Sequence, residues 1–375
     1  MYIKRDIEEN IENWLFKDKI IILYGARQVG KTTLVKNFIR KYGTDRSYID
    51  CENLSVQNAL KNHDAKFLRS FLGEGNFFVL DEAQRVENIG VSLKLLIDTY
   101  PELQLIATGS SSFDLSNKII EPLTGRSITT TLYPLSINEI IKNVSESSID
   151  FQINKCLRFG GYPGLFSSDE KSAITLLNNI ASNYLYKDIL MFESLRKSDL
   201  IIQLMQLLAF QIGNEVSLSE LATKLQTSKQ TVSRYINLLE KAFVVFHLRP
   251  LSRNLRNEIG KKNKIYFYDL GIRNALIGNF NDLNVRNDVG ALWENFCVVE
   301  RKKYLERNEL FRNMYFWRNH FGQEIDYVEE YNGQFDAYEF KWSEALVKFP
   351  KPFKSAYLPK ILQVVNKENY RDFLI

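Results

Sequence analysis

Residues 20–32 read IIILYGARQVGKT, and positions 25–32 fit the phosphate-loop pattern G-x-x-x-x-G-K-[ST]. The apolar run before the loop predicts a buried strand, and the spacing in TTLVKNFI after it predicts a helix. Two glycines let the backbone curl so that N–H groups point at phosphate oxygens, and the helix dipole favours the same charge. We therefore expect a site for ATP and Mg²⁺, in which Lys31 reaches the β- and γ-phosphates and Thr32 ligates the metal. The residues expected to hold the nucleotide are Gly25, Ala26, Arg27, Gln28, Val29, Gly30, Lys31, Thr32 and Thr33.

The chain around this loop alternates short apolar runs with helical patterns. Strands are predicted at Ile20–Tyr24, Ser47–Asp50, Phe77–Leu80, Leu103–Thr108 and Ile128–Leu132. Helices are predicted at Thr32–Tyr42, Gln57–Leu72 and Ile89–Tyr100. This rhythm predicts an α/β fold, a P-loop parallel sheet with helices on both faces.

A second motif, FFVLDE at 77–82, ends a predicted buried strand in two carboxylates. In P-loop proteins the nucleotide lies at the carboxyl ends of the strands. Asp81 is therefore expected to hold Mg²⁺, and Glu82 to orient and deprotonate an attacking water. An acid directly after the magnesium aspartate favours hydrolysis over binding alone.

EPLTGR (121–126) and YPLSINE (133–139), together with GARQVGKTTL, VLDEAQ and ATGSSS, resemble a prokaryotic group of AAA/STAND-like ATPases. That group is usually described only as ATP-binding proteins, with a C-terminal domain of unknown function. GGYP (160–163), YFYDLG (266–271) and YFWRNHFGQEIDYV (315–328) also follow its pattern. The resemblance covers nearly the whole chain.

The resemblance implies further roles at the nucleotide. LQLIATGSSS (103–112) is similar to the sensor-1 strand, which lies between the P-loop strand and the Asp81 strand. Thr108 or Ser110 would then hydrogen-bond the γ-phosphate or its water; alternatively, the serines cap the next helix. Arg126 is the candidate for an arginine acting in trans on a neighbour's γ-phosphate, which needs a homo-oligomer. Arg126 could equally be a structural partner for an acid.

Residues 151–205 are predicted to form a helical lid, and 206–275 a winged helix. Ser217 and Ser228 each precede a helical pattern, and the second helix has an apolar face opposite a polar one. Strands at 242–248 and 264–269 would enclose a basic stretch, 249–264, as a wing. Double-stranded DNA is one predicted partner; a hinge or dimer surface is the alternative. The candidate DNA contacts are Lys229, Gln230, Arg234, Asn237 and Lys261.

Residues 276–375 are predicted to form a small α/β domain: a helix at 291–304, three strands and a Lys-rich tail. Alternation along a strand places Glu339 and Lys341 on one face, where Asp326 from the paired strand can meet them. With Glu294 on the helix, this pattern resembles a PD-(D/E)XK nuclease core, although Ile325 replaces the proline. Asp326 and Glu339 would then bind magnesium and Lys341 would help position water. An ion-paired, inactive surface is the alternative.

Composition limits the remaining possibilities. The chain has 375 residues, 45% hydrophobic and 25% charged, as expected of a globular protein with two or three domains. Its longest apolar run, 20–26, is too short to span a bilayer, and MYIKRDIEEN has no signal-peptide core. Three scattered cysteines argue against disulfides, so a cytoplasmic protein is expected. The predicted domains are 1–150 (ATPase core), 151–205 (lid), 206–275 (winged helix) and 276–375 (nuclease-like).

Two functions are compatible with these patterns. In the first, an ATP-hydrolysing protein acts on or binds DNA through its winged helix and nuclease-like domain. In the second, an ATP-dependent switch or scaffold binds protein partners, and its C-terminal domain is catalytically inactive. Salt-dependent DNA binding would favour the first.

Overall fold

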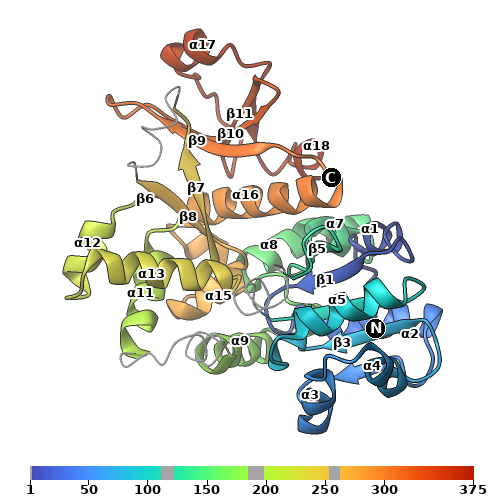
Figure 1. Ribbon diagram of the computed structural model, residues 1–375. Helices are drawn as coiled ribbons and strands as arrows, with labels where there is room; N and C mark the ends of the chain where they lie inside the picture. The colour runs from blue at the N-terminus through green and yellow to red at the C-terminus, as the bar shows by residue number, and fades with distance from the viewer. Residues whose placement is uncertain (1, 111–121, 185–197, 253–261) are drawn as a thin grey trace. The chain divides into compact units, whose positions relative to one another are not determined.

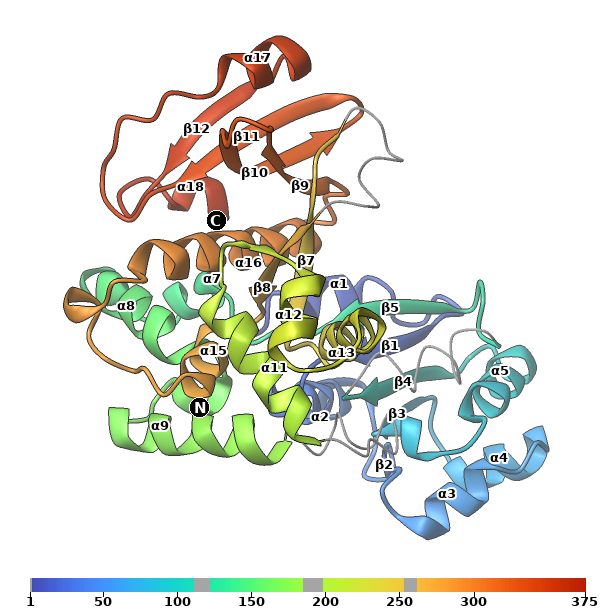
Figure 2. The same ribbon diagram turned by 90° about the vertical axis from the view of Figure 1, so that its left-hand side faces the viewer.

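The structure is a computed structural model that describes residues 2–110, 122–184, 198–252 and 262–375 (Figures 1 and 2). It divides into two compact units. Unit 1 comprises residues 1–134 with 241–243, and unit 2 comprises 135–240 with 244–375.

Unit 1 is built around a five-stranded parallel sheet of order β2-β3-β4-β1-β5. Its strands are β1 (Ile20–Tyr24), β2 (Tyr48–Asp50), β3 (Phe77–Asp81), β4 (Gln104–Gly109) and β5 (Ser127–Thr131). Every residue of β1, β3 and β4 is buried, because helices cover both faces. This confirms the predicted P-loop α/β sheet, and β4 lies between β1 and β3 as expected.

The helices of unit 1 are α1 (Glu8–Glu12), α2 (Lys31–Tyr42), α3 (Leu54–Leu60), α4 (Ala65–Leu72) and α5 (Ile89–Thr99), with a 3₁₀ turn at Ala83–Arg85. Side chains of α3, α4 and α5 share one core with Ile22, Leu80 and Leu105 of the sheet. On the other face, Tyr42 of α2 packs on Phe77, with ring centroids 5.8 Å apart. The helix predicted at Gln57–Leu72 is two helices, because Asp64 caps α4 by accepting a 2.7 Å bond from the N–H of Phe67.

Unit 2 contains a seven-stranded sheet of order β12-β11-β10-β9-β7-β8-β6. Strands β7 and β9 pair in parallel, with Arg249 opposite Tyr315, so the segments predicted as a winged helix and as a nuclease-like domain share one sheet. The tail after residue 341 also contains regular structure, because β12 pairs in parallel with β11. The strands are β6 (Glu215–Val216), β7 (Val245–Pro250), β8 (Asn263–Phe267), β9 (Asn313–Arg318), β10 (Glu324–Tyr331), β11 (Gln334–Phe340) and β12 (Ile361–Val365).

The helix α16 (Val289–Arg307) runs along this sheet and buries Trp293, Phe296 and Cys297. Figure 2 shows it between the C-terminal strands and α8 and α15. The other helices of unit 2 are α7 (Ile137–Ile141), α8 (Ile149–Phe159), α9 (Glu170–Asn179), α11 (Ser198–Phe210), α12 (Leu218–Lys224), α13 (Lys229–Lys241), α15 (Leu270–Leu276), α17 (Lys351–Tyr357) and α18 (Arg371–Leu374). Short 3₁₀ turns lie at Glu146–Ser148, Pro163–Leu165 and Leu283–Val285, and a π-helix at Ile180–Tyr184.

Candidate functional site

The loop between β1 and α2 has a shape that only glycine allows at two positions. A Cβ added to Gly25 would lie 2.2 Å from the carbonyl oxygen of Leu132. Gly30, the N-cap of α2, has φ +99°, which side-chain-bearing residues rarely adopt. Both glycines predicted for phosphate binding are therefore required by the backbone itself.

Lys31 is buried at the start of α2. Its ammonium donates hydrogen bonds to the carbonyl oxygens of Gly25 (2.7 Å) and Ala26 (2.9 Å). The cation is thus held over the loop. Of the other predicted nucleotide contacts, Val29 is buried, Arg27 is half-buried, and Gln28 and Thr33 are exposed.

The Asp81 carboxylate is the centre of a hydrogen-bond network at the carboxyl end of β3. Thr32 Oγ1 donates to its Oδ2 (2.8 Å), and Thr108 Oγ1 donates to its Oδ1. The hydroxyl of Tyr48 also donates to Oδ2 (2.5 Å), and burial together with this bond raises the pKa of Tyr48. Tyr48 was not predicted, since its contact depends on β2 and β3 being neighbours.

Thr32 and Asp81 fit a magnesium ion by their chemistry. A hydroxyl and a carboxylate oxygen lie 2.8 Å apart beside the N-terminus of α2. Mg²⁺ prefers hard oxygen ligands and commonly takes only one or two from the protein, the rest coming from water and phosphates.

Glu82 follows Asp81 in a left-handed conformation, with φ +53°. Its N–H donates to Thr108 Oγ1 (3.1 Å), and its carboxylate accepts a hydrogen bond from the Gln84 amide. The same amide donates to Ser110 Oγ (3.3 Å). The structure therefore brings Thr32, Asp81, Glu82, Thr108 and Ser110 together, as predicted, and adds Gln84.

Arg5 is a buried part of this site that the sequence did not indicate. Its guanidinium donates to the carbonyl oxygen of Val29 in the loop (2.7 Å) and to that of Tyr133 (2.6 Å). Its own N–H donates to Glu8 (2.7 Å). The N-terminal segment is thereby tied to the phosphate loop over 24 residues of sequence.

Arg126 lies at the amino end of β5, an edge strand of the sheet. It immediately precedes β5, and its carbonyl oxygen accepts a bond from Ile20 N at the beginning of β1 (2.9 Å). Its guanidinium pairs with Asp98 (2.5 Å), and both side chains are 40% exposed. The observed pair corresponds to the structural alternative; a role in trans stays a prediction.

The four predicted nuclease-like residues lie in one cluster in unit 2. Lys341 Nζ is 3.0 Å from Glu339 Oε2 and 3.5 Å from Asp326 Oδ2. Glu294 accepts hydrogen bonds from Lys264 (2.9 Å) and from the hydroxyl of Tyr266 (2.7 Å). The sequence did not indicate three further residues of this cluster, Lys264, Tyr266 and Glu324. Their proximity to the predicted residues depends on the order of the strands in the sheet.

Lys264 requires a correction. It was grouped with the basic wing, but its side chain is 2% exposed and pairs with Glu294, Glu324 and Asp326. Burial lowers the pKa of Lys264, but these acids outweigh it and raise the pKa. Of the other basic residues in this stretch, Arg249 and Lys262 are exposed, and Arg253, Arg256 and Lys261 lie outside the described residues.

Burial is the largest influence on the pKa of two acids of the cluster. It raises the pKa of Glu294 to about 7, with Asp326 adding to the effect and Lys264 opposing it. Burial likewise raises the pKa of Glu339 to about 7, with Asp326 adding to the effect and Lys341 opposing it. Within the described residues, no three His, Cys, Asp or Glu side chains are arranged to hold a metal ion. Asp326 and Glu339, the residues expected to hold Mg²⁺, both lie beside the ammonium of Lys341.

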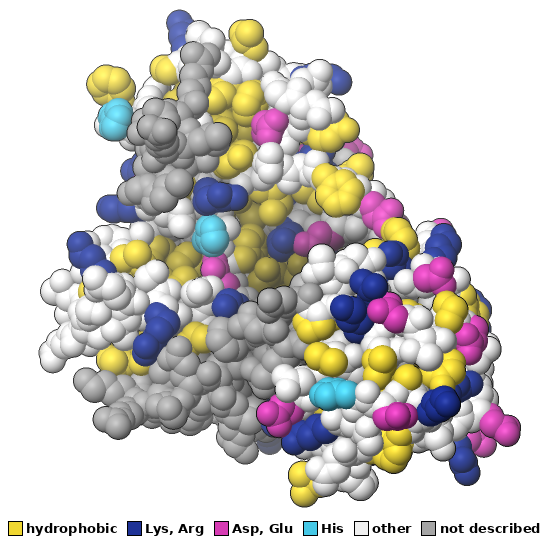
Figure 3. All heavy atoms as spheres, in the orientation of Figure 1, with side chains coloured by type: hydrophobic (Ala, Val, Ile, Leu, Met, Phe, Trp, Pro, Cys, Tyr) yellow, Lys and Arg dark blue, Asp and Glu magenta, His cyan; other side chains and the backbone are white. Residues whose placement is uncertain are grey.

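Helix α13 has one buried apolar face and one exposed polar face. Ser228 accepts a 3.1 Å bond from the N–H of Thr231, and Val232, Tyr235, Ile236 and Leu239 are buried. Figure 3 shows Lys and Arg side chains over α12 and α13. The exposed residues of α13 include Lys229, Gln230, Ser233, Arg234 and Asn237.

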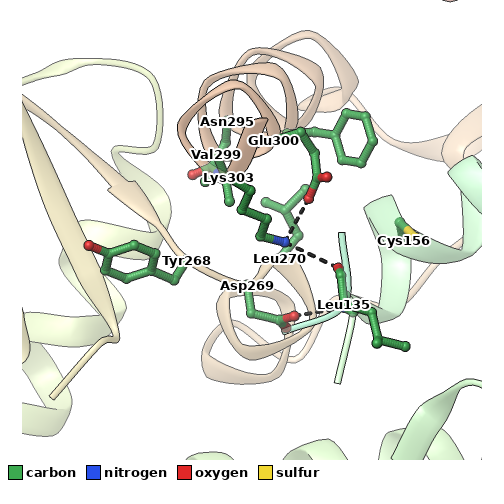
Figure 4. A pocket seen from close by; sticks show the side chains of 12 residues that line it. Leu135, Cys156, Tyr268, Asp269, Leu270, Asn295, Val299, Glu300 and Lys303 are labelled. Atoms are coloured by element: carbon green, nitrogen blue, oxygen red, sulfur yellow. Dashed lines mark hydrogen bonds and ion pairs between the residues drawn. The ribbon is translucent and has the colours of Figure 1, made fainter. Parts of the chain in front are cut away.

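A small pocket in unit 2 marks where α8, α16 and the segment before α15 meet (Figure 4). Lys303 pairs with Glu300 (2.7 Å) and donates to Leu135 O (3.2 Å). Asp269 accepts from Gly161 N (2.7 Å), and a Cβ on Gly161 would lie 2.6 Å from Leu135 O. The GGYP motif thus forms a tightly packed turn.

Comparisons with known proteins agree with the nucleotide loop. Residues 17–141 match the family described as AAA domain, and 150–283 and 289–373 match two domains of unknown function, DUF8612 and DUF4143. The AAA match and the parallel sheet together support a P-loop ATPase fold for residues 17–141. Within the described ranges, no helix is long and apolar enough to cross a membrane.

Similar curated proteins come from distant organisms. An uncharacterized protein of Mycobacterium tuberculosis is 26% identical over 90% of this chain and 74% of its own length. One from Methanocaldococcus jannaschii is 27% identical over 81% and 72%, respectively. Among solved structures, the ORC2 protein of Aeropyrum pernix in its ADP form shares 11% identity over 74% of this chain and 92% of that one, with a TM-score of 0.33. That score is too low to bear on function.

Proposed function

We propose that this protein binds and hydrolyses ATP at the loop 25–32. The observation that carries the proposal is the Asp81 carboxylate, joined to Thr32 and Thr108 at the carboxyl end of β3. Loop N–H groups and Lys31 would bind the phosphates, and Thr32 and Asp81 would hold the Mg²⁺ that accompanies ATP and neutralises its charge.

Glu82 is the proposed general base. Its backbone is fixed by Thr108, and its carboxylate by Gln84, which also contacts Ser110. A carboxylate held in this way can orient a water molecule and take its proton as the water attacks the γ-phosphate. Thr108 and Ser110 would hold the Asp81 and Glu82 carboxylates in position relative to the nucleotide.

Steady-state ATPase assays and nucleotide binding test this assignment. Lys31→Ala should weaken ATP binding, because the phosphate-directed charge is lost. Glu82→Gln should retain binding but lower kcat by roughly 100-fold or more, because an amide cannot accept the proton. Glu87→Gln, at an exposed carboxylate of the same unit, is the matched control and should behave as wild type. Wild-type turnover by Glu82→Gln would contradict the proposed role.

We further propose that the exposed face of α13 contacts double-stranded DNA, with α12, α13, β7 and β8 acting as a winged helix. The supporting observation is that α13 buries its apolar face and exposes Lys229, Gln230, Arg234 and Asn237. Lysine and arginine would contact phosphates, and the amides and Arg234 could reach base edges. ATP turnover would then switch this surface between states.

Fluorescence anisotropy on duplex DNA at several salt concentrations tests the DNA contact. Lys229→Ala with Arg234→Ala should weaken binding and reduce the salt dependence by about one unit for each lost phosphate contact. Lys66→Ala with Lys171→Ala, at two exposed lysines on α4 and α9, is the charge-matched control. If the wild-type protein does not bind DNA at low salt, this result would support the alternative of an ATP-dependent scaffold for protein partners.

Magnesium-dependent cleavage by the C-terminal cluster is less well supported. Glu294, Asp326, Glu339 and Lys341 do lie together, as a nuclease-like core requires. However, the buried ammonium of Lys264 also lies among Glu294, Glu324 and Asp326, and the nuclease-like pattern did not include this cation. An inactive C-terminal domain agrees better with this arrangement.

A further inference from the structure

A buried lysine on β8, the second strand from one edge of the unit 2 sheet, lies among acids. Lys264 of β8 places its ammonium 2.9 Å from Glu294 Oε1 and 4.0 Å from Asp326 Oδ1, and it also pairs with Glu324. Tyr266, two residues along the same strand and therefore on the same face, donates to the same oxygen of Glu294. One strand thus supplies both the cation and a hydroxyl donor.

A second ammonium lies beside the other two carboxylates. Lys341 contacts Glu339 and Asp326 at 3.0 Å and 3.5 Å. Asp326 Oδ2 also accepts a 2.9 Å bond from the N–H of Phe340. All four acids of the cluster are therefore engaged by positively charged or hydrogen-bonding groups of the chain.

A divalent cation would meet unfavourable charges here. Carboxylates attract Mg²⁺ only when their oxygens converge on it, whereas the ammonium groups repel it. The ammonium of Lys264 is itself buried and shared among three of these carboxylates. Lys264 thus already supplies positive charge at Asp326, one of the two predicted magnesium ligands.

We infer that this cluster is a metal-free ion-pair centre in which the Lys264 ammonium supplies the positive charge that a metal ion would otherwise provide. Its four acids come from α16, β10 and β11, and Lys264 comes from β8, next to the α12–α13 pair. The centre therefore fastens the strand of the predicted winged helix to the C-terminal strands. This inference does not depend on ATP hydrolysis or on DNA binding.

Mn²⁺ binding, followed by electron paramagnetic resonance in full-length protein without nucleotide, provides the test. Every sample carries Asp81→Asn, so that the phosphate loop contributes no divalent site. We expect the Mn²⁺ isotherm to be the same with and without Asp326→Asn, because the cluster takes no metal. One Mn²⁺ per chain that disappears with Asp326→Asn would overturn the inference.

Removing the lysine provides the second measurement. Lys264→Met should lower the melting temperature by roughly 10 °C, because buried acids lose their partner. In that variant added Mn²⁺ should raise the melting temperature again, and Asp326→Asn should abolish the rise. Lys264→Arg retains the charge and should stay insensitive to Mn²⁺. If Lys264→Met does not fold, the comparison of Asp326→Asn with its parent still decides.

Discussion

Arg5 shows how much a single side chain can contribute to the nucleotide site. One buried guanidinium satisfies two backbone carbonyls, at Val29 in the phosphate loop and at Tyr133 after β5. A hydrogen bond from a charged donor contributes more to stability than one from a neutral donor. A buried carbonyl oxygen that loses its donor also costs free energy. Arg5 is therefore a positioning residue for the loop.

Arg5→Ala should lower both stability and ATP affinity. Loss of two bonds from a charged donor should cost roughly 2–4 kcal/mol of unfolding free energy, and the released loop should bind ATP more weakly. Urea unfolding and ATP titration measure the two effects. Arg5→Lys should rescue only part of both, because an ammonium lacks the planar fork that spans two acceptors. The neighbouring exposed Lys4→Ala serves as control; equal effects at both positions would contradict the role.

At the scale of elements, two arginines and one aspartate join three helices of unit 2. Arg273 of α15 donates to Asp288 (2.6 Å) and to the carbonyl oxygen of Ala209 in α11 (2.9 Å). Arg286 donates to both carboxylate oxygens of Asp288, each at 2.8 Å. Asp288 directly precedes α16, so the start of that helix is fixed to α15 and α11.

The ion pairs at Asp288 predict a defined loss of stability in acid. Burial raises the pKa of Asp288, but the hydrogen bonds from Arg286 and Arg273 outweigh it and lower the pKa to about 2. The folded pKa is below the unfolded value of about 3.9. The charged carboxylate therefore stabilises the fold above pH 4, and this contribution is lost as the pH falls from about 4 to 2.

Asp288→Asn should remove roughly 3 kcal/mol of stability at pH 7, because two arginines lose their partner. Urea unfolding of variant and wild type should show a difference that is constant above pH 5 and shrinks between pH 4 and 2. The constant region is the internal control. A difference that keeps its full size at pH 2 would show that Asp288 is not the titrating group.

At the scale of the whole molecule, Arg126 bears on assembly. It lies at the amino edge of the sheet, away from the carboxyl ends of the strands where the phosphate loop lies. If it acts on a nucleotide at all, that nucleotide must belong to another copy of the chain. The prediction of a homo-oligomer therefore depends on this residue.

A mixing experiment tests that role. Arg126→Ala should lose ATPase activity while binding ATP normally, and Lys31→Ala should lose activity through binding. If Arg126 acts in trans, a mixture of the two variants should recover measurable turnover, because Lys31→Ala chains supply the arginine to intact sites. Arg85→Ala, at another partly exposed arginine of unit 1, is the control. Full activity of Arg126→Ala would contradict a catalytic role for Arg126, and its ion pair with Asp98 would then be structural.

Much of this protein follows from local sequence patterns. The loop GARQVGKT after a buried strand, and carboxylates at the end of FFVLDE, placed the nucleotide site because strand, loop and helix are contiguous in the chain. Period-two alternation likewise grouped Glu339, Lys341 and Asp326 on one face, as the structure has them. In these cases each motif is local, because it lies in one strand–loop–helix segment, at the end of one strand or in a hairpin.

Other features depended on the order of strands and on packing between distant segments. Arg5 reaches Val29 and Tyr133, Tyr48 reaches Asp81, and β7 pairs with β9 across 60 residues of chain, none of which has a local signal. The sequence grouped Lys264 with the exposed basic residues of the predicted wing. A run of basic residues does not indicate whether water or carboxylates surround each side chain. The burial of Lys264 was decided by acids from two other elements, α16 and β10, and only the tertiary structure brings those charges together.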